Sequence, residues 1–97
     1  MNIQKMMQQA QAMQSKVQAE LDALRLEGSA GGGLVRIEMT GAKEVLAVRI
    51  DPSAVVDSPD VEMLQDLVLA ALRDAGRQVD EAVKKKTAAM LGGMLPR

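Results

Sequence analysis

The charged side chains of this chain are carboxylates, lysines and arginines. This set limits the reactions that the chain can catalyse and the metals that it can bind. The sequence contains no histidine, cysteine or tyrosine. Histidine is the commonest acid–base group near pH 7, and histidine and cysteine are the usual zinc ligands. The acids lie at predicted helix starts or at ion-pair spacing, which is not the arrangement of a catalytic carboxylate pair. We therefore expect no catalytic residues, no metal, no cofactor and no small-molecule substrate.

The composition also restricts the kind of nucleic acid that this chain can bind. It contains no Phe, Tyr or Trp. Proteins usually hold single strands by stacking bases on aromatic rings, at about 1 to 3 kcal/mol per base. A nucleic-acid partner should therefore be a duplex, held through its phosphates and the shape of its grooves.

Basic residues gather near the two ends of the chain, although the net charge is −1. Residues 1–19 hold two lysines and no acid, residues 51–66 hold five acids and no base, and residues 67–97 hold six bases and three acids. Duplex binding needs a local excess of positive charge. The candidate DNA-binding residues are Lys5, Gln9, Lys16, Lys84, Lys85 and Lys86. A solvated polar face of the helices explains these residues equally well. Any binding to DNA should be weak and sensitive to salt.

Residues 2–25 have the periodicity of a long amphipathic helix with Asn2 as its N-cap. Apolar residues recur at steps of three and four, at Ile3, Met6, Ala10, Met13, Val17, Leu21 and Leu24, as in a coiled coil. Such a helix is about 36 Å long, which is longer than a small sheet can cover. The first five of these residues are therefore predicted to form a dimer interface with a second copy. The alternative is that the stripe packs only on the chain's own sheet.

Four glycines within residues 28–33 separate this helix from the next part of the chain. Glycine tolerates positive φ, so the stretch predicts a turn. The other interpretation, a phosphate-binding loop, fails because no Lys-Ser or Lys-Thr follows the last glycine and Leu34 opens a strand rather than a helix.

Residues 26–51 are predicted to form a three-stranded antiparallel meander. Residues 34–40 and 45–50 alternate apolar and polar side chains, and the connection 41–44 makes them a hairpin. A short strand within residues 26–30 would pair on the other side of residues 34–40. The expected register sets Met39 opposite Leu46, Ile37 opposite Val48 and Val35 opposite Ile50.

The same register sets Arg36 opposite Arg49 on the outer face of the sheet. Like charges directly across a ladder are unfavourable unless an anion lies nearby. Glu38 on the same face is one such anion, and a DNA phosphate is another.

Residues 58–90 are predicted to form the second long helix, with Ser58 as N-cap, Pro59 in the first turn and an apolar face that covers the sheet. Spacings of four residues predict the ion pairs Arg77–Glu81, Asp80–Lys84 and Glu81–Lys85, and leave Lys86 without a partner on its own helix. The fold class is therefore α+β: one domain over residues 1–97, with a helix at 2–25, a sheet at 26–51, a helix at 58–90 and a short tail.

Short stretches along the whole chain form a recognisable series. They are residues 1–7 with the glutamine-rich run that follows, residues 28–35, 50–53 and 63–68, the pair Ala70-Ala71, and residues 92–94. This series resembles the YbaB/EbfC family of bacterial nucleoid-associated proteins. The resemblance implies a small homodimer that binds DNA, alters its conformation, and acts in nucleoid organisation and gene regulation.

The remaining inferences concern location and the rival function. No signal peptide and no uninterrupted apolar run of about 18 residues is present, so we expect a cytoplasmic protein without a membrane partner, associated with the nucleoid as the resemblance implies. The alternative to a DNA-binding homodimer is a dimeric protein–protein interaction module, whose adaptable contacts would come from Met6, Met7, Met13 and Met90.

Overall fold

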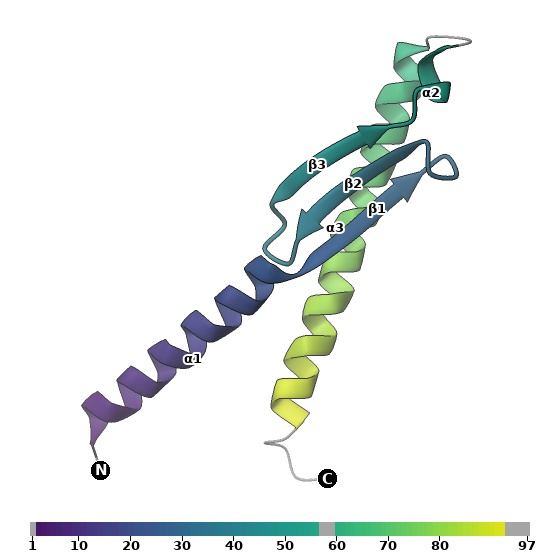
Figure 1. Ribbon diagram of the computed structural model, residues 1–97. Coiled ribbons are helices and arrows are strands. Elements are labelled where there is room, and N and C mark those ends of the chain that lie inside the picture. The colour runs from purple at the N-terminus through teal and green to yellow at the C-terminus, as the bar shows by residue number, and fades with distance from the viewer. Residues whose placement is uncertain (1, 57–59, 93–97) are drawn as a thin grey trace.

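The computed structural model describes residues 2–56 and 60–92, and this part of the chain forms one sheet and three helices (Figure 1). The elements are α1 (Ile3–Ala23), β1 (Arg25–Ala30), β2 (Val35–Thr40), β3 (Val45–Ile50), α2 (Ser53–Val56) and α3 (Val61–Gly92). The predicted α+β fold, a long helix followed by a meander and a second long helix, is confirmed.

Three details differ from the sequence-based boundaries. Helix α1 ends at Ala23 rather than at residue 25, helix α3 extends to Gly92 rather than to residue 90, and the short helix α2 was not predicted. Asn2 is the N-cap as expected, because its Oδ1 accepts a hydrogen bond from the Lys5 N–H at 3.2 Å. The predicted cap at Ser58 and Pro59 lies outside the described residues.

The sheet is antiparallel in the order β1-β2-β3. Val35 lies opposite Ile50 and Ile37 opposite Val48, as expected. The predicted pairing of Met39 with Leu46 is wrong, since Met39 lies opposite Val45. The Thr40 N–H donates to the Glu44 carbonyl at 2.9 Å and closes the hairpin. This end of the hairpin is shifted by one residue relative to the rest of the ladder. A β-bulge at Leu46 accommodates the shift.

The core lies between α3 and the first two strands. Val35, Ile37 and Met39 of β2 are buried against Ala71, Ala75 and Val79 of α3. The small alanines let the helix approach β1 closely, and Gly28 stands at the nearest point. A Cβ at Gly28 would lie 2.3 Å from the Ala75 backbone nitrogen and 2.4 Å from the Ala71 carbonyl oxygen. Gly28 is therefore required by the distance between the strand and the helix.

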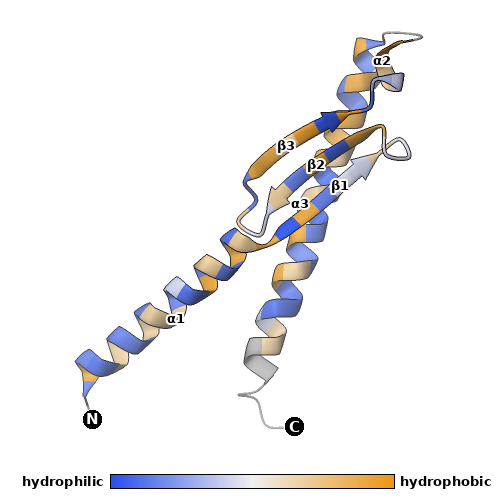
Figure 2. Cartoon of the chain, in the orientation of Figure 1, coloured by the Kyte–Doolittle hydropathy of each residue, from blue (hydrophilic) through white to orange (hydrophobic). Residues whose placement is uncertain are grey.

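Strand β3 is left uncovered by α3. Val48 and Ile50 share a sheet face with the buried Ile37 and Val35, yet they are 49% and 40% exposed, against 1% and 0%. Figure 2 shows β3 coloured mostly as hydrophobic. A helix is about 10 Å wide and neighbouring strands are about 4.8 Å apart, so one helix covers about two strands. The part of this apolar face on β3 therefore has no cover from residues 2–56 and 60–92.

Helix α1 projects away from the sheet and packs against almost nothing (Figure 1). None of its residues is buried. Only its base is held, because the Leu21 carbonyl accepts hydrogen bonds from the N–H groups of Leu24 at 3.1 Å and Gly41 at 2.9 Å. The radius of gyration is 19.0 Å, whereas a compact domain of this length has about 13 Å. The single chain is extended.

Asp74 ties α3 to the free edge of β1. Its Oδ2 accepts a hydrogen bond from the Ser29 N–H at 3.0 Å, and its carboxylate also contacts Arg77 and Gln78. The bond from Ser29 is the main cause that holds the pKa of Asp74 below its ordinary value, with smaller contributions from Arg77 and Gln78 against the opposing effect of burial.

Asp74→Asn is expected to remove a pH-dependent part of the stability. Because folding lowers the pKa of Asp74, its charge stabilises the fold above about pH 4, and this contribution is lost as pH falls through the lowered folded pKa. Urea unfolding between pH 2 and 7 measures the free energy of unfolding of both proteins. The difference between these two free energies should disappear at the acid end of the range. Asp66→Asn, at an exposed acid of the same helix, is the control. If the free energies of unfolding of Asp74→Asn and the unsubstituted protein differ by the same amount at every pH in this range, the assignment is contradicted.

Candidate nucleic-acid interface

The predicted DNA-binding residues near the N-terminus lie on one side of an exposed helix. Lys5, Gln9 and Lys16 are all exposed on α1. They are separated by four and seven residues, which brings them to a common face at 3.6 residues per turn. The acids of this helix, Glu20 and Asp22, lie at its end nearest the sheet. The projecting part of α1 therefore carries only positive charge.

The predicted residues near the C-terminus lie on the last third of α3. Lys84 and Lys85 are exposed, whereas Lys86 is partly buried and its Nζ lies 3.5 Å from Oε2 of Glu20 on α1. Lys86 thus joins the two helices, and its charge is partly compensated.

The ion pairs predicted within α3 do not form. Arg77 pairs with Asp74 instead of Glu81, and Asp80 pairs with Lys43 of the β2–β3 connection at 2.8 Å instead of with Lys84. The ion pairs of the described residues include neither Lys84 nor Lys85. Asp80 has a tertiary partner in Lys43, which competes with its neighbour on the helix because a pair on an exposed helix contributes only about 0.3–0.5 kcal/mol; Arg77 takes a different neighbour on the same helix, three residues away. Lys84 and Lys85 are therefore free to contact a ligand.

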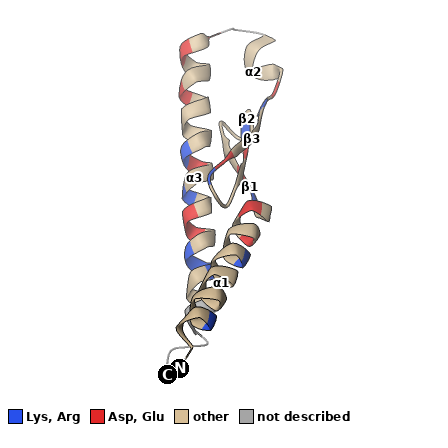
Figure 3. Ribbon diagram, turned by 90° about the vertical axis from the view of Figure 1, so that its left-hand side faces the viewer, with Lys and Arg blue, Asp and Glu red and all other residues tan. Residues whose placement is uncertain are grey.

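The two groups of lysines lie on separate helices that leave the sheet toward the same end of the molecule (Figures 1 and 3). Figure 3 shows acidic residues on the first part of α3 and lysines farther along both helices. The fold brings the two groups to one end but not into a single patch.

The predicted interface stripe on α1 is uncovered. Ile3 and Met13 are 69% and 60% exposed, Met6 and Ala10 are also exposed, and Val17 is partly buried. The alternative that the stripe packs on the chain's own sheet is wrong, because α1 contacts the sheet only near its base. Met7 is exposed as well, and the side chain of Met90 lies outside the described residues.

A second apolar surface was missed by the sequence analysis. It consists of the exposed Val48 and Ile50 of β3 together with a groove of about 370 Å³ on α3, and we call these residues the β3–α3 surface. The groove is lined by Val61, Leu64, Gln65, Val68, Leu69 and Leu72. The available signal was the number of elements, since one helix cannot cover three strands. Exposed apolar residues and an apolar groove of this kind are typical of a contact with another molecule.

Other kinds of site find no support in the described part of the chain. No group of three or more His, Cys, Asp or Glu side chains there is arranged to hold a metal ion. No helix within those residues combines the length and the apolar character needed to cross a membrane.

A small α+β protein with lysines along two projecting helices has the features of a DNA-binding protein. This chain belongs to the YbaB/EbfC DNA-binding family, whose model matches residues 1–94. The resemblance noted in the sequence is thereby confirmed.

Individual relatives agree with this assignment. A protein of Acidobacterium capsulatum named as a nucleoid-associated protein is 45% identical over 96 residues, which cover 95% of this chain and 89% of the relative. A nucleoid-associated protein of Chloroflexus aurantiacus is 45% identical over 97 residues, covering 97% of this chain and 96% of the relative. The crystal structure of an uncharacterised Helicobacter pylori protein has the same fold, with a TM-score of 0.73, 24% identity, and coverage of 94% of this chain and 98% of that one.

Proposed function

We propose that this protein is a nucleoid-associated homodimer that binds double-stranded DNA through phosphate contacts, with little sequence specificity, and alters DNA conformation. The observation that carries the proposal is the placement of Lys5, Lys16, Lys84 and Lys85 on exposed, projecting segments of α1 and α3. Family membership supports DNA as the partner. Lysines are mobile point charges that suit phosphates and read few bases. The dimer belongs at the nucleoid, as the names of its relatives indicate.

Self-association is supported by the apolar surface that the single chain leaves open. The β3–α3 surface comprises an exposed apolar sheet face and a groove on a helix, and β3 is also an edge strand of the sheet. A two-fold axis beside β3 would pair the two surfaces with each other, as isologous contacts require. We place the centre of the dimer there. The stripe formed by Ile3, Met6, Ala10, Met13 and Val17 remains the interface predicted from sequence, and it can be tested separately.

Dimerisation also accounts for DNA binding by a chain with a net charge of −1. Each copy supplies only a few lysines, and a dimer supplies two such sets at a fixed separation. The second set then binds at a high effective concentration, which multiplies a weak affinity. DNA held at two separated points must fit their geometry, and this fit is the origin of the proposed change in DNA conformation.

The test of this function is the salt dependence of duplex binding. If lysine–phosphate contacts provide the affinity, the logarithm of the binding constant should fall linearly with the logarithm of salt, by about 0.9 for each phosphate contacted. Fluorescence anisotropy with duplexes of several unrelated sequences should give nearly the same slope and affinity. A flat salt dependence, or strong preference for one sequence, would contradict the proposal.

The double variant Lys84→Gln with Lys85→Gln should weaken binding to all duplexes alike. We expect the salt slope to decrease by up to about 2 per chain, because each lysine that contacts a phosphate contributes about 0.9. Arg73→Gln is the control, since Arg73 is an exposed base of the same helix outside the predicted set of DNA-binding residues. Unchanged affinity in the double variant would remove the end of α3 from the interface.

A further inference from the structure

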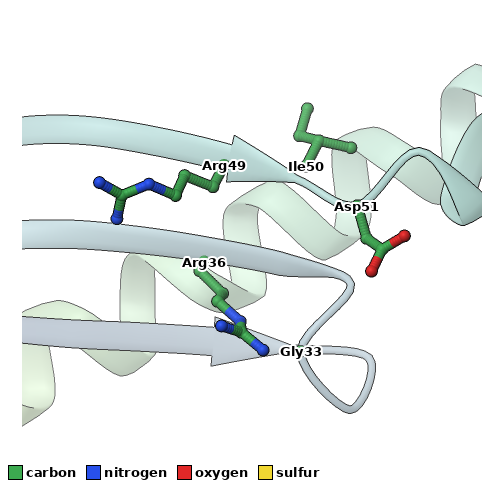
Figure 4. A pocket seen from close by; sticks show the side chains of 5 residues that line it. All are labelled: Gly33, Arg36, Arg49, Ile50 and Asp51. Atoms are coloured by element: carbon green, nitrogen blue, oxygen red, sulfur yellow. The ribbon is translucent and has the colours of Figure 1, made fainter.

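A small polar pocket lies at the end of the sheet, where β3 ends beside the start of β2 (Figure 4). Its volume is about 220 Å³, and it is lined by Gly33, Arg36, Arg49, Ile50 and Asp51. None of these residues belongs to the lysine-bearing parts of α1 and α3 or to the groove on α3.

Two arginines stand directly opposite each other at this pocket. The sequence predicts that Arg36 pairs with Arg49 across β2 and β3, and the structure has this register. Like charges at such positions destabilise a ladder unless they are compensated. Arg49 lies 3.9 Å from Glu38, but the same carboxylate is also 3.9 Å from Arg25. Arg36 forms no ion pair with a carboxylate of the described residues.

The acid in the pocket does not neutralise the two arginines. Asp51 accepts hydrogen bonds from the Ser53 N–H at 2.9 Å and from the Ser53 hydroxyl at 2.8 Å. The backbone bond from Ser53 is the largest cause that lowers the pKa of Asp51, and the charge of Arg36 is a lesser one. The carboxylate is therefore turned to the start of α2, and the pocket keeps an excess of positive charge.

The glycine turn leaves one side of the pocket open. Gly33 has φ +95°, and a Cβ at this position would lie 3.3 Å from Nη2 of Arg36. Figure 4 shows the Arg36 guanidinium next to this glycine, whereas the Arg49 guanidinium extends along β3 away from it, so the Arg49 side chain has to turn to share a ligand with Arg36. Because the turn carries no side chain here, a ligand can reach the guanidinium from the side of the turn.

We propose that this pocket binds a phosphate group, held by the guanidinium groups of Arg36 and Arg49. Guanidinium N–H groups match phosphate oxygens in pairs, and a dianion or phosphodiester supplies the negative charge that the facing arginines lack. The group can belong to inorganic phosphate or to a nucleic-acid backbone, which share this chemistry. The site is separate from the lysines, so it does not depend on the proposed function.

The test is a titration followed by NMR of the arginine Nε–H groups and backbone amides. Inorganic phosphate is added against chloride at equal ionic strength, and a short blunt duplex is used in a second arm. We expect saturable shifts at Arg36, Arg49 and the Gly33 amide, and none at Arg73, an exposed arginine of α3 that does not line the pocket. Equal or non-saturating shifts at all three arginines in both arms would overturn the proposal.

Variants separate this site from the lysines of α1 and α3. Arg36→Gln with Arg49→Gln should lower phosphate affinity at least about 10-fold, whereas Arg73→Gln on α3 should leave it unchanged. In Lys84→Gln with Lys85→Gln the phosphate response should persist even if duplex binding is lost. A response confined to the phosphate arm identifies a free phosphate ligand, and one in the duplex arm identifies the DNA backbone. A saturable response that survives in the Arg36/Arg49 double variant would overturn the assignment.

Discussion

Val48→Asp is expected to convert the proposed dimer into single chains. Val48 is half exposed on the free chain, so the fold tolerates a polar group there. In a dimer centred on the β3–α3 surface the carboxylate would be buried without a partner, at a cost of about 3 kcal/mol or more. The interface is two-fold, so the cost occurs twice and the dissociation constant rises by about 10⁴-fold. Sedimentation equilibrium at micromolar concentration measures this change.

The matched control is Met13→Asp on the stripe of α1. Met13 is exposed at 60% against 49% for Val48, and it belongs to the interface predicted from the sequence. Dissociation by Val48→Asp alone supports the β3–α3 surface, and dissociation by Met13→Asp alone supports the stripe. If the unsubstituted protein sediments as a single chain, neither surface is a dimer interface and the proposed function loses its basis.

Gly28→Ala is expected to cause a large loss of stability. The added Cβ would collide with backbone atoms of Ala75 and Ala71 at 2.3 and 2.4 Å, and backbone inside a helix cannot move aside as a flexible side chain does. We expect a cost of about 3 kcal/mol, at the upper end of overpacking effects. For a domain of this size the thermal midpoint should fall by roughly 12 to 24 °C. Differential scanning calorimetry at constant protein concentration provides the measurement.

Two further variants show whether the backbone contact is the cause. Gly32→Ala adds a Cβ with nothing within 4 Å, so it carries only the strain of its positive φ and should cost much less. Ala75→Gly removes the Cβ that lies 2.6 Å from the added atom but leaves the closer backbone atoms in place. It should therefore not rescue Gly28→Ala. Full rescue would show that side chains, rather than the backbone, set the distance between β1 and α3.

The strands and helices themselves were predictable because their signals are local. The alternation of Val35 with Ile37 and the apolar spacing of α1 follow directly from the geometry of strands and helices. The hairpin register was predicted for Arg36 with Arg49 but missed at Met39, where hydrogen bonds of the connection overrode the apolar pattern.

The candidate sites were predictable only in part. Lys84 and Lys85 were identified by their charge and are exposed, but the partner of Lys86 is Glu20, distant in sequence. The β3–α3 surface was not foreseen, because alternation marks Val48 as inward-facing whether or not anything covers it.

The amino-acid order predicts the two long helices, the extended stretches and the apolar face of each, and it excludes aromatic stacking and the chemistry of histidine or cysteine. The fold in three dimensions adds that α3 covers two strands of three, that α1 projects from the sheet, and which ions pair. The reason is physical: periodicity depends on bonds between near neighbours in the chain, whereas coverage and pairing depend on the widths of elements and on distances between residues far apart in sequence.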